Sequence, residues 1–257
     1  MSAIYFQSSA RSADGLQRSG NEDSAFVSGR LIAVADGMGG HAGGEVASKI
    51  AIKALQKLSP VLTSSEIDSD SVEDLLLNSL FTIDSQIGEY AEEAIELRGM
   101  GTTLTALLIV DTKIALLHVG DSRCYRLRGN TLEQLSNDHT VIQELLDQGA
   151  ISRSEIADHP QRSVLTQALM GQGTVTPVLQ IYEVKEKDRY LLCSDGLSSV
   201  LTEKEIKSLL KKSDRSAALK ALIDATYING APDNVTVIVA DITGEEITTN
   251  EVLGAAQ

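Results

Sequence analysis

The chain has 257 residues, 42% apolar side chains, no tryptophan and a formal net charge of −14. A surface with this charge repels nucleic acid and anionic membrane, so we expect neither as a partner. The length suits one domain with a sizeable core, built mainly from aliphatic side chains.

Three further features favour a cytoplasmic protein without a membrane segment. The longest apolar run, 104–110, is far shorter than the roughly 20 residues that span a bilayer. Residues 1–11 lack the apolar core of a signal peptide. Cys124 and Cys193 lie in apolar, strand-like stretches without a CxxC pair, so we predict buried, reduced thiols.

The first part of the chain combines short strands with two long helices. Amphipathic helices are predicted at about 44–58 and 72–97, where apolar residues recur at three- and four-residue intervals. The polar stretch 59–71 is the predicted loop between them. Strands are expected on both sides of this helical pair, at 4–9, 23–28, 31–35 and 102–110.

The remaining chain is predicted to contain more strands and shorter helices. Residues 140–148 form a helix that stops at Gly149, and Ser152–Glu155 and Thr202–Glu205 both match capping boxes. Asp214 caps a helix that runs to about Thr226. Strands are expected at 114–119, 124–128, 178–182, 190–193 and 235–240. This order indicates an α+β or layered sandwich rather than regular βαβ units.

Four aspartates share one setting at strand ends. Asp36, Asp121 and Asp195 each follow an apolar run, and Asp233 precedes one. Because the end of one antiparallel strand lies beside the start of the next, all four can meet on one sheet rim. Clustered carboxylates need neutralising, and their hard oxygens suit Mg²⁺ or Mn²⁺. The pattern indicates a metal site, although each Asp-Gly pair taken alone is typical of a turn.

The glycine-rich loop after Asp36 supports a different interpretation. Residues 37–44 follow a strand, open a helix and fit the dinucleotide fingerprint G-x-G-x-x-A at Gly37, Gly39 and Ala42. However, Asp36 would place a negative charge beside a pyrophosphate. Two helices also follow where a Rossmann unit needs a second strand with an acidic residue. We therefore rank nucleotide binding below metal binding.

Seven short motifs together resemble those of the metal-dependent protein phosphatases of type 2C, especially the bacterial members. The motifs occur in the order found in that family and cover roughly residues 5–241. They are Arg18-Ser-Gly-Asn-Glu22-Asp23, Val34-Ala-Asp36-Gly37-Met-Gly-Gly-His41-Ala-Gly-Gly, Met100-Gly-Thr-Thr103, His118-Val-Gly-Asp121-Ser-Arg123, Ser136-Asn-Asp138-His139-Thr, Ser194-Asp195-Gly196-Leu and Asp233-Asn234-Val-Thr.

The resemblance implies an overall architecture for the chain. We expect a four-layer α-β-β-α sandwich, in which two antiparallel sheets are flanked by helix pairs. Residues 1–243 would form a single catalytic domain. Within it, 140–174 would be a flap-like insertion near the active site, and the polar residues 244–257 would be a loose C-terminal tail.

The resemblance also implies a set of metal ligands. Asp36 would bridge two Mn²⁺ or Mg²⁺ ions. The Gly37 carbonyl would ligate one of them with Glu22 nearby, and Asp195 and Asp233 would hold the other. Asp195 would also take part in a third, weaker site.

Other residues would complete that site and carry the reaction. Asp121 would be the second ligand of the third ion, while Asp23 and Asn234 would orient ligands and waters. A metal-bound hydroxide would attack phosphorus in line, and Arg18 would grip the phosphate oxygens. His41 is the candidate general acid for the leaving oxygen.

The position of this histidine departs from the pattern of many eukaryotic members. They have a histidine directly after the Asp-Gly pair, where this chain has Met38, so His41 could instead stabilise the loop. We expect His118 to be packed within a strand and His139 to organise a helix start.

The implied function is hydrolysis of phosphoserine and phosphothreonine in proteins by a monomeric enzyme. Its partners would be phosphorylated proteins, including bacterial Ser/Thr kinases and their substrates. The main alternative is a non-catalytic relative that binds phosphoproteins. Such relatives usually lack some of the metal aspartates, and none is missing here.

Overall fold

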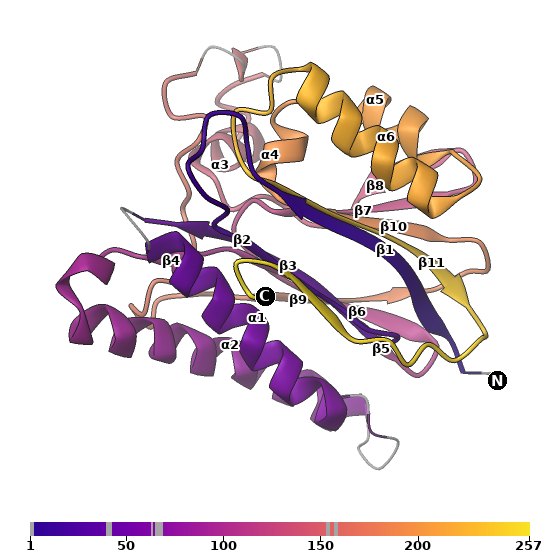
Figure 1. Cartoon of the computed structure of the whole chain (residues 1–257), viewed down its shortest axis with the longest axis horizontal. Coiled ribbons are helices and arrows are strands. Elements are labelled where there is room, and N and C mark those ends of the chain that lie inside the picture. Colours follow the sequence, from indigo (N-terminus) through magenta and orange to yellow (C-terminus); the bar gives the residue numbers. More distant parts are fainter. Residues whose placement is uncertain (1–2, 40–42, 63, 65–68, 153–154, 157–158) are drawn as a thin grey trace.

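The computed structural model describes residues 3–39, 43–62, 64, 69–152, 155–156 and 159–257. It confirms the predicted α+β sandwich, because two antiparallel sheets pack together with helices on both outer sides (Figure 1). Within these ranges, no helix is long and apolar enough to cross a membrane.

One sheet has five strands in the order β1-β11-β10-β7-β8. Along β10, Tyr190 and Leu192 face the core between the sheets, while Leu191 and Cys193 face the helices. Both faces are buried, so the strand is a continuous apolar run. The strands are β1 (Tyr5–Ala13), β7 (Arg123–Arg128), β8 (Thr131–Gln134), β10 (Arg189–Cys193) and β11 (Val235–Thr243).

The other sheet has the order β12-β2-β3-β5-β6-β9, with the short β4 paired to β3. In β3, Ile32 and Val34 face the inter-sheet core, while Leu31, Ala33 and Ala35 face the helices. The strands are β2 (Asp23–Val27), β3 (Leu31–Met38), β4 (Gly101–Thr102), β5 (Leu104–Val110), β6 (Lys113–Val119), β9 (Val178–Glu183) and β12 (Glu251–Gly254).

Helices cover the outer face of each sheet (Figure 1). α1 and α2 pack on the β3 sheet, and α4, α5 and α6 pack on the β10 sheet. The predicted capping box is confirmed at Thr202 and Glu205, and Asp214 caps α6. The helices are α1 (Gly43–Leu62), α2 (Ser69–Glu93), η1 (Ile95–Leu97), α3 (Val141–Asp147), α4 (Asp195–Ser198), α5 (Glu203–Leu210) and α6 (Arg215–Ile228).

The predicted loop at 59–71 is wrong in extent. α1 continues through Pro60 to Leu62, and α2 already begins at Ser69. The sequence predicted a loop here because the stretch is polar, and proline also normally ends a helix. The side chains of Ser59 and Leu62 are buried, so packing of the last turn against the core outweighs the lost hydrogen bond.

The prediction of a loose tail at 244–257 is also wrong. Residues Glu251–Gly254 form β12, which pairs with β2 at the edge of the sheet. Leu253 and Ala256 are buried, and the Ala255 N–H donates to the carbonyl of Asp23 over 2.8 Å. Tertiary contacts therefore order a segment whose local sequence carries little strand signal.

The two cysteines are free and buried, in agreement with the sequence. Burial raises the pKa of both thiols, to about 12 for Cys193. Neither Cys124 nor Cys193 is therefore a reactive thiolate near neutral pH.

Candidate metal and phosphate site

Asp36 lies near the end of β3, where its backbone is fixed from both sides. Its N–H donates to the hydroxyl of Thr103 (3.0 Å), and its carbonyl accepts from the Thr103 N–H (2.9 Å) and the Thr102 hydroxyl (2.9 Å). On the other side, Asp36 is the register partner of Asp23 in β2. These contacts hold two carboxylates on neighbouring strands.

The glycines at this rim allow three segments to approach closely. A Cβ atom on Gly37 would lie 2.1 Å from the carbonyl oxygen of Gly44 and 2.5 Å from that of Glu22. A Cβ on Gly196 would lie 1.8 Å from the carbonyl oxygen of Asn234. Larger side chains would separate the helix, the strands and the acidic residues, so both positions require glycine.

The second sheet contributes the other carboxylates. Asp195 stands two residues after β10, and Asp233 stands two residues before β11. Asn234 ties this rim to the first sheet, because its Oδ1 accepts from the Glu22 N–H (3.0 Å) and its Nδ2 donates to the Gly20 carbonyl (2.9 Å). The site is thus assembled across the sandwich from chain segments more than 200 residues apart.

Ser194 makes a second link between the sheets. Its hydroxyl donates to the carboxylate of Asp23 over 2.7 Å and accepts from the Thr236 N–H over 3.0 Å. Asp23 is itself almost fully buried. The predicted orienting residues Asp23 and Asn234 therefore both lie where they can hold the site's backbone and side chains in place.

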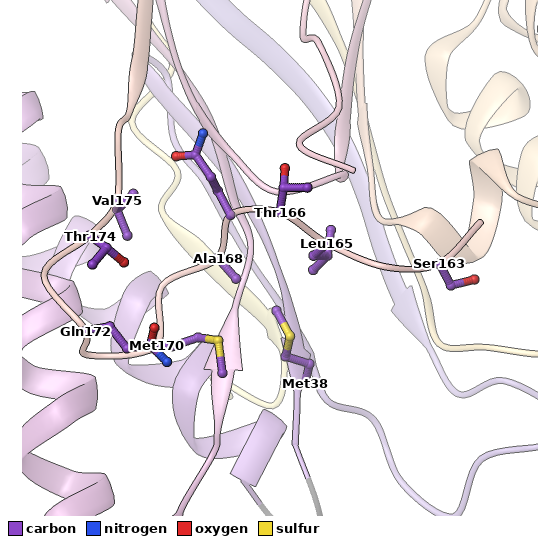
Figure 2. Close-up of a pocket in the computed structure, with 10 residues that line it drawn as sticks. Met38, Ser163, Leu165, Thr166, Ala168, Met170, Gln172, Thr174 and Val175 are labelled. Carbon is purple, nitrogen blue, oxygen red and sulfur yellow. The ribbon is translucent and has the colours of Figure 1, made fainter. Parts of the chain in front are cut away.

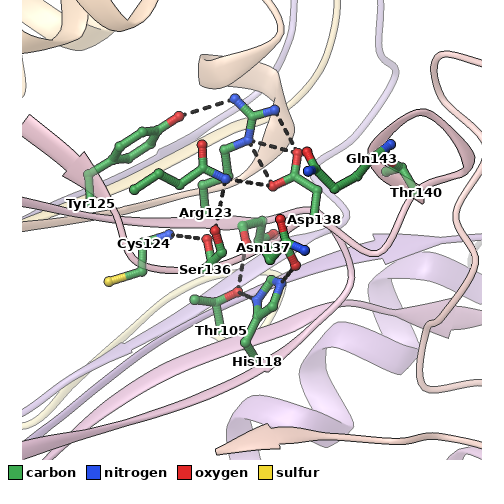
Figure 3. A network of polar contacts seen from close by, with 12 residues as sticks. Thr105, His118, Arg123, Cys124, Tyr125, Ser136, Asn137, Asp138, Thr140 and Gln143 are labelled. Atoms are coloured by element: carbon green, nitrogen blue, oxygen red, sulfur yellow. Dashed lines mark hydrogen bonds and ion pairs between the residues drawn. The ribbon is translucent and has the colours of Figure 1, made fainter. Parts of the chain in front are cut away.

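Asp121 follows β6 and is supported by a polar network (Figure 3). The Arg123 guanidinium binds Asp138 through Nε (2.9 Å) and Nη2 (2.6 Å) and donates to the Tyr125 hydroxyl (3.1 Å). This network fixes the strand that leaves the Asp121 turn. The sequence motifs contained Arg123 and Asp138, but reasoning from the sequence assigned them no role.

The two histidines near this turn are structural, as predicted. His118 is buried between the Thr105 hydroxyl (2.9 Å) and the Asn137 carbonyl (3.0 Å), and burial lowers its pKa to about 3. The His139 Nδ1 accepts from the Gly120 N–H over 3.1 Å, next to Asp121. Both rings therefore hold backbone groups near the Asp121 turn.

The carboxylates at the rim perturb one another. Burial and, to a smaller extent, the charges of neighbouring aspartates together raise the pKa of Asp23 and of Asp121 to about 7. Burial followed by the charges of four other aspartates raises the pKa of Asp36 well above its usual value. Asp195 is one of these four, so the carboxyl groups of Asp36 and Asp195 lie close enough for their charges to interact. The cluster therefore carries more negative charge than its surroundings balance.

These carboxylates are nevertheless reachable from outside. Asp36, Asp121, Asp195, Asp233 and Glu22 all retain partial solvent exposure. One of them, Glu22, lines a cavity of about 450 Å³. Its lining consists of Arg18, Ser19, Gly20, Asn21, Glu22, Gly39 and Glu45.

Arg18 is a cation that forms ion pairs with two acids of this cluster. Its Nη2 contacts the Asp233 carboxylate at 2.5 Å, and its Nη1 lies 4.0 Å from Glu22. The hydrogen bond to Asp233 raises the pKa of Arg18, with further contributions from Glu22 and Asp36. The guanidinium thus stands at the cavity mouth, although it engages a carboxylate here.

The donor set fits hard divalent cations. Several carboxylates with raised pKa gain stabilisation from a cation, and all the donors are oxygens. Within the described ranges, no three acidic, histidine or cysteine side chains already converge at ligand distances around one point. One of the acids is engaged by another group instead, since Asp233 accepts a hydrogen bond from Arg18.

The structure brings together nearly all the residues predicted for the site. His41, the predicted general acid, lies outside the described residues. Ser194 and Thr103 are contacts that reasoning from the sequence missed. Their only sequence signal is their place directly beside Asp195 and in the Gly-Thr-Thr motif.

Comparison with known proteins agrees with this geometry. The family model described as protein phosphatase 2C matches residues 17–222. The chain is 44% identical over 242 residues to the serine/threonine protein phosphatase PstP of Mycobacterium tuberculosis, covering 93% of this chain and 45% of that protein. This chain therefore spans about half the length of that relative.

Two further matches extend along most of both chains. The serine/threonine phosphatase stp of Listeria welshimeri is 38% identical, covering 82% of this chain and 84% of that one. The crystal structure of the catalytic domain of PstP in complex with two manganese ions superposes with a TM-score of 0.85. It is 40% identical and covers 93% of this chain and 99% of the other.

Proposed function

The chain belongs to the protein phosphatase 2C family, and we propose that it is a metal-dependent protein serine/threonine phosphatase. The observation that carries the proposal is the accessible cluster of mutually repelling carboxylates at the rim of the sandwich. The proposed cofactors are Mn²⁺ or Mg²⁺, and the two manganese ions bound by the related catalytic domain support this assignment.

Specific residues would hold these ions. Asp36 would bridge two of them, with the Gly37 carbonyl and Glu22 on one side and Asp195 and Asp233 on the other. When bound, such ions polarise the phosphoryl group and lower the pKa of water. The protein itself keeps the carboxylates in register through the backbone contacts of β3 and the start of β11.

A third ion would be held by Asp121 together with Asp195. Among the neighbouring charges, that of Asp195 raises the pKa of Asp121 the most. The Arg123–Asp138 network would keep the Asp121 turn in place when the charge in the site changes.

The remaining roles concern the substrate. Arg18 would exchange its carboxylate partner for phosphate oxygens, for which a forked guanidinium is well suited. It is nearly half exposed, so it can make this exchange. Asp23 and Asn234 would orient ligands, and His41 remains the proposed general acid.

We propose phosphorylated proteins as substrates, including Ser/Thr kinases and their targets. The names of the relatives support this class of substrate. We place the enzyme in the cytoplasm, where the free thiols of Cys124 and Cys193 would stay reduced. We also propose that it acts as a monomer, which light scattering of the purified protein would test.

A metal-dependence assay tests the proposed function. Purified protein is incubated with a chromogenic aryl phosphate and with pSer, pThr and pTyr peptides, in Mn²⁺, in Mg²⁺ or in chelator. We expect turnover with Mn²⁺, preference for pSer and pThr peptides, and none after chelation. Full activity in chelator, or phosphopeptide binding without turnover, would contradict the proposal.

A further inference from the structure

A second pocket lies at the end of the strand that carries Asp36 (Figure 2). It has a volume of about 290 Å³ and is formed between the end of β3 and the segment 163–175. None of its lining residues carries a charge, in a chain whose net charge is −14. The lining consists of Met38, Ser163, Leu165, Thr166, Gln167, Ala168, Met170, Gln172, Thr174 and Val175.

The pocket and the candidate active site both take residues from strand β3. Met38 is two residues beyond Asp36, and side chains two apart on a strand point to the same face, about 7 Å from each other. Met38 and Met170 lie next to each other, since a Cβ atom on Gly101 would approach the Cγ atoms of both, at 3.5 and 2.8 Å.

The pocket wall is preformed by contacts on two sides. The buried carboxylate of Asp84 in α2 accepts the backbone N–H groups of Met170 (2.9 Å), Gly171 (2.8 Å) and Gly173 (2.9 Å). Leu169 exchanges two backbone hydrogen bonds with Thr102, at 3.0 and 2.9 Å. A wall held in this way loses little conformational entropy when a ligand binds.

Close packing of two glycines locks the same wall. Gly171 has a φ of +74°, and a Cβ atom there would lie 2.1 Å from the Cα of Gly88 in α2. The segment therefore cannot move closer to or slide along α2 without losing this contact and the hydrogen bonds to Asp84.

We propose that this pocket receives an uncharged, apolar side chain of the substrate polypeptide, one or two residues from its phosphorylated residue. The inference rests on the proposed phosphatase function. Side chains two apart in an extended peptide are separated by about 7 Å, which matches the spacing of Asp36 and Met38. Two flexible thioethers adapt to aliphatic and aromatic shapes.

The lining disfavours charged occupants. A side chain of either charge would be desolvated in the pocket without a charged partner in the lining. The volume is near the lower end of that of small-molecule sites, which start at about 300 Å³, so it suits one side chain.

Matched phosphopeptides and two lysine variants test the proposal. Phosphothreonine peptides carry Leu, Lys or Glu at each of the two positions on either side, and kcat/KM is measured with Mn²⁺. Met170→Lys places a cation in the pocket. Val164→Lys adds the same charge to the same segment at an exposed side chain outside the lining.

We expect the wild type to favour Leu over Glu by about tenfold at one position near the phosphothreonine, mainly through KM. Met170→Lys should reduce this ratio at least tenfold and raise the relative rate on the Glu peptide, while Val164→Lys should retain the wild-type ratio. Because the Leu-to-Glu ratio of kcat/KM is measured within each variant, differences in the folded fraction cancel.

Other outcomes overturn the proposal in distinguishable ways. A wild type that turns over all peptides equally contradicts the pocket but leaves the phosphatase function intact. Equal shifts in the two lysine variants indicate a general charge effect and also contradict it. Equal loss on every peptide in Met170→Lys assigns Met170 to the reaction site itself. Failure of the wild type to hydrolyse any peptide contradicts the proposed function instead.

Discussion

The two ends of strand β10 each carry an aspartate, and their surroundings are opposite. Asp188 precedes the strand and is fully buried, yet it is matched by Arg128 through Nε (2.7 Å) and Nη2 (2.6 Å). Burial acts to raise the pKa of Asp188, but the bonds from Arg128 and the Lys185 N–H outweigh it, so the pKa is lowered.

Asp195 follows the same strand and stands among other carboxylates. Burial, followed by the charge of Asp233, raises the pKa of Asp195, and the charges of Arg18 and Arg123 offset this only in part. The comparison shows that burial alone does not mark a functional acid. What distinguishes the Asp195 end is charge that the protein leaves unbalanced while keeping it accessible.

The largest effect should follow Asp36→Asn. Losing the proposed bridging carboxylate should lower kcat/KM on an aryl phosphate with Mn²⁺ by about 10³-fold or more. The thermal midpoint in chelator should not fall, because one of several repelling charges is removed. Asp111→Asn, at an exposed turn, is the control and should retain activity. Near-normal activity of Asp36→Asn would contradict the proposed functional difference between the Asp188 end and the Asp195 end of β10.

Asp188→Asn should show the reverse pattern at the paired end. The substitution removes the negative charge that pairs with Arg128, and breaking such a buried pair costs about 3 kcal/mol of unfolding free energy. Activity per folded molecule should stay within about twofold of the wild type. Denaturant titration measures the loss. Asp224→Asn, in an exposed pair with Lys220, should cost less than about 1 kcal/mol.

Asn234→Ala should weaken the site without removing a ligand. It frees the Glu22 N–H and the Gly20 carbonyl, and loss of such supporting contacts typically lowers metal affinity about 10–100-fold. Calorimetric titration with Mn²⁺ measures this change. Asn229→Ala, at the exposed end of α6, is the matched control. Equal affinities of the two variants would contradict a supporting role for Asn234.

The last and smallest expected effect is a dependence of the unfolding free energy on pH. The folded-state pKa values of Asp23 and Asp121 are raised to about 7, above the unfolded pKa of about 4. The stability that these two groups contribute is therefore fully present below about pH 4 and is lost as the pH rises toward 7. In chelator, stability should therefore fall from pH 5 to 7 through these groups. The lowered pKa of Asp188 acts oppositely, since its contribution is lost only as pH falls through its folded value.

Added Mn²⁺ should flatten or reverse this slope, because metal binds the deprotonated carboxylates and stabilises the folded state. Denaturation midpoints at pH 5, 6 and 7, with chelator and with Mn²⁺, measure the difference. Parallel slopes under the two conditions would mean that the titrating acids are not those that bind metal.

Local signals predicted many elements correctly. The capping contacts of Thr202 and Asp214 appeared because cap chemistry depends on residues within one helical turn. Buried strands such as β5 appeared because both faces are apolar. β12 and the last turn of α1 did not, since burial of Leu253 and Leu62 depends on distant packing partners.

The residues of the site also fall into those that local sequence signals predict and those that depend on tertiary packing. The setting of Asp36, Asp121, Asp195 and Asp233 at strand ends was readable, because strand ends can be located from apolar runs. The contact of Ser194 with Asp23 was not, since it joins positions 171 residues apart and depends on how the two sheets stack. The pairing of Arg128 with Asp188 was hidden for the same reason.

The last strand has a practical consequence for anyone who expresses or labels this protein. Ala255 contacts Asp23 directly, so a tag or fluorophore attached after Gln257 begins three residues from a contact of the metal site. The register of β1 with β11 places Tyr5 at the far end of the strand, about 26 Å away from Ala13. Purification handles and immobilisation chemistry therefore belong at the amino-terminal side, where they leave metal titrations undisturbed.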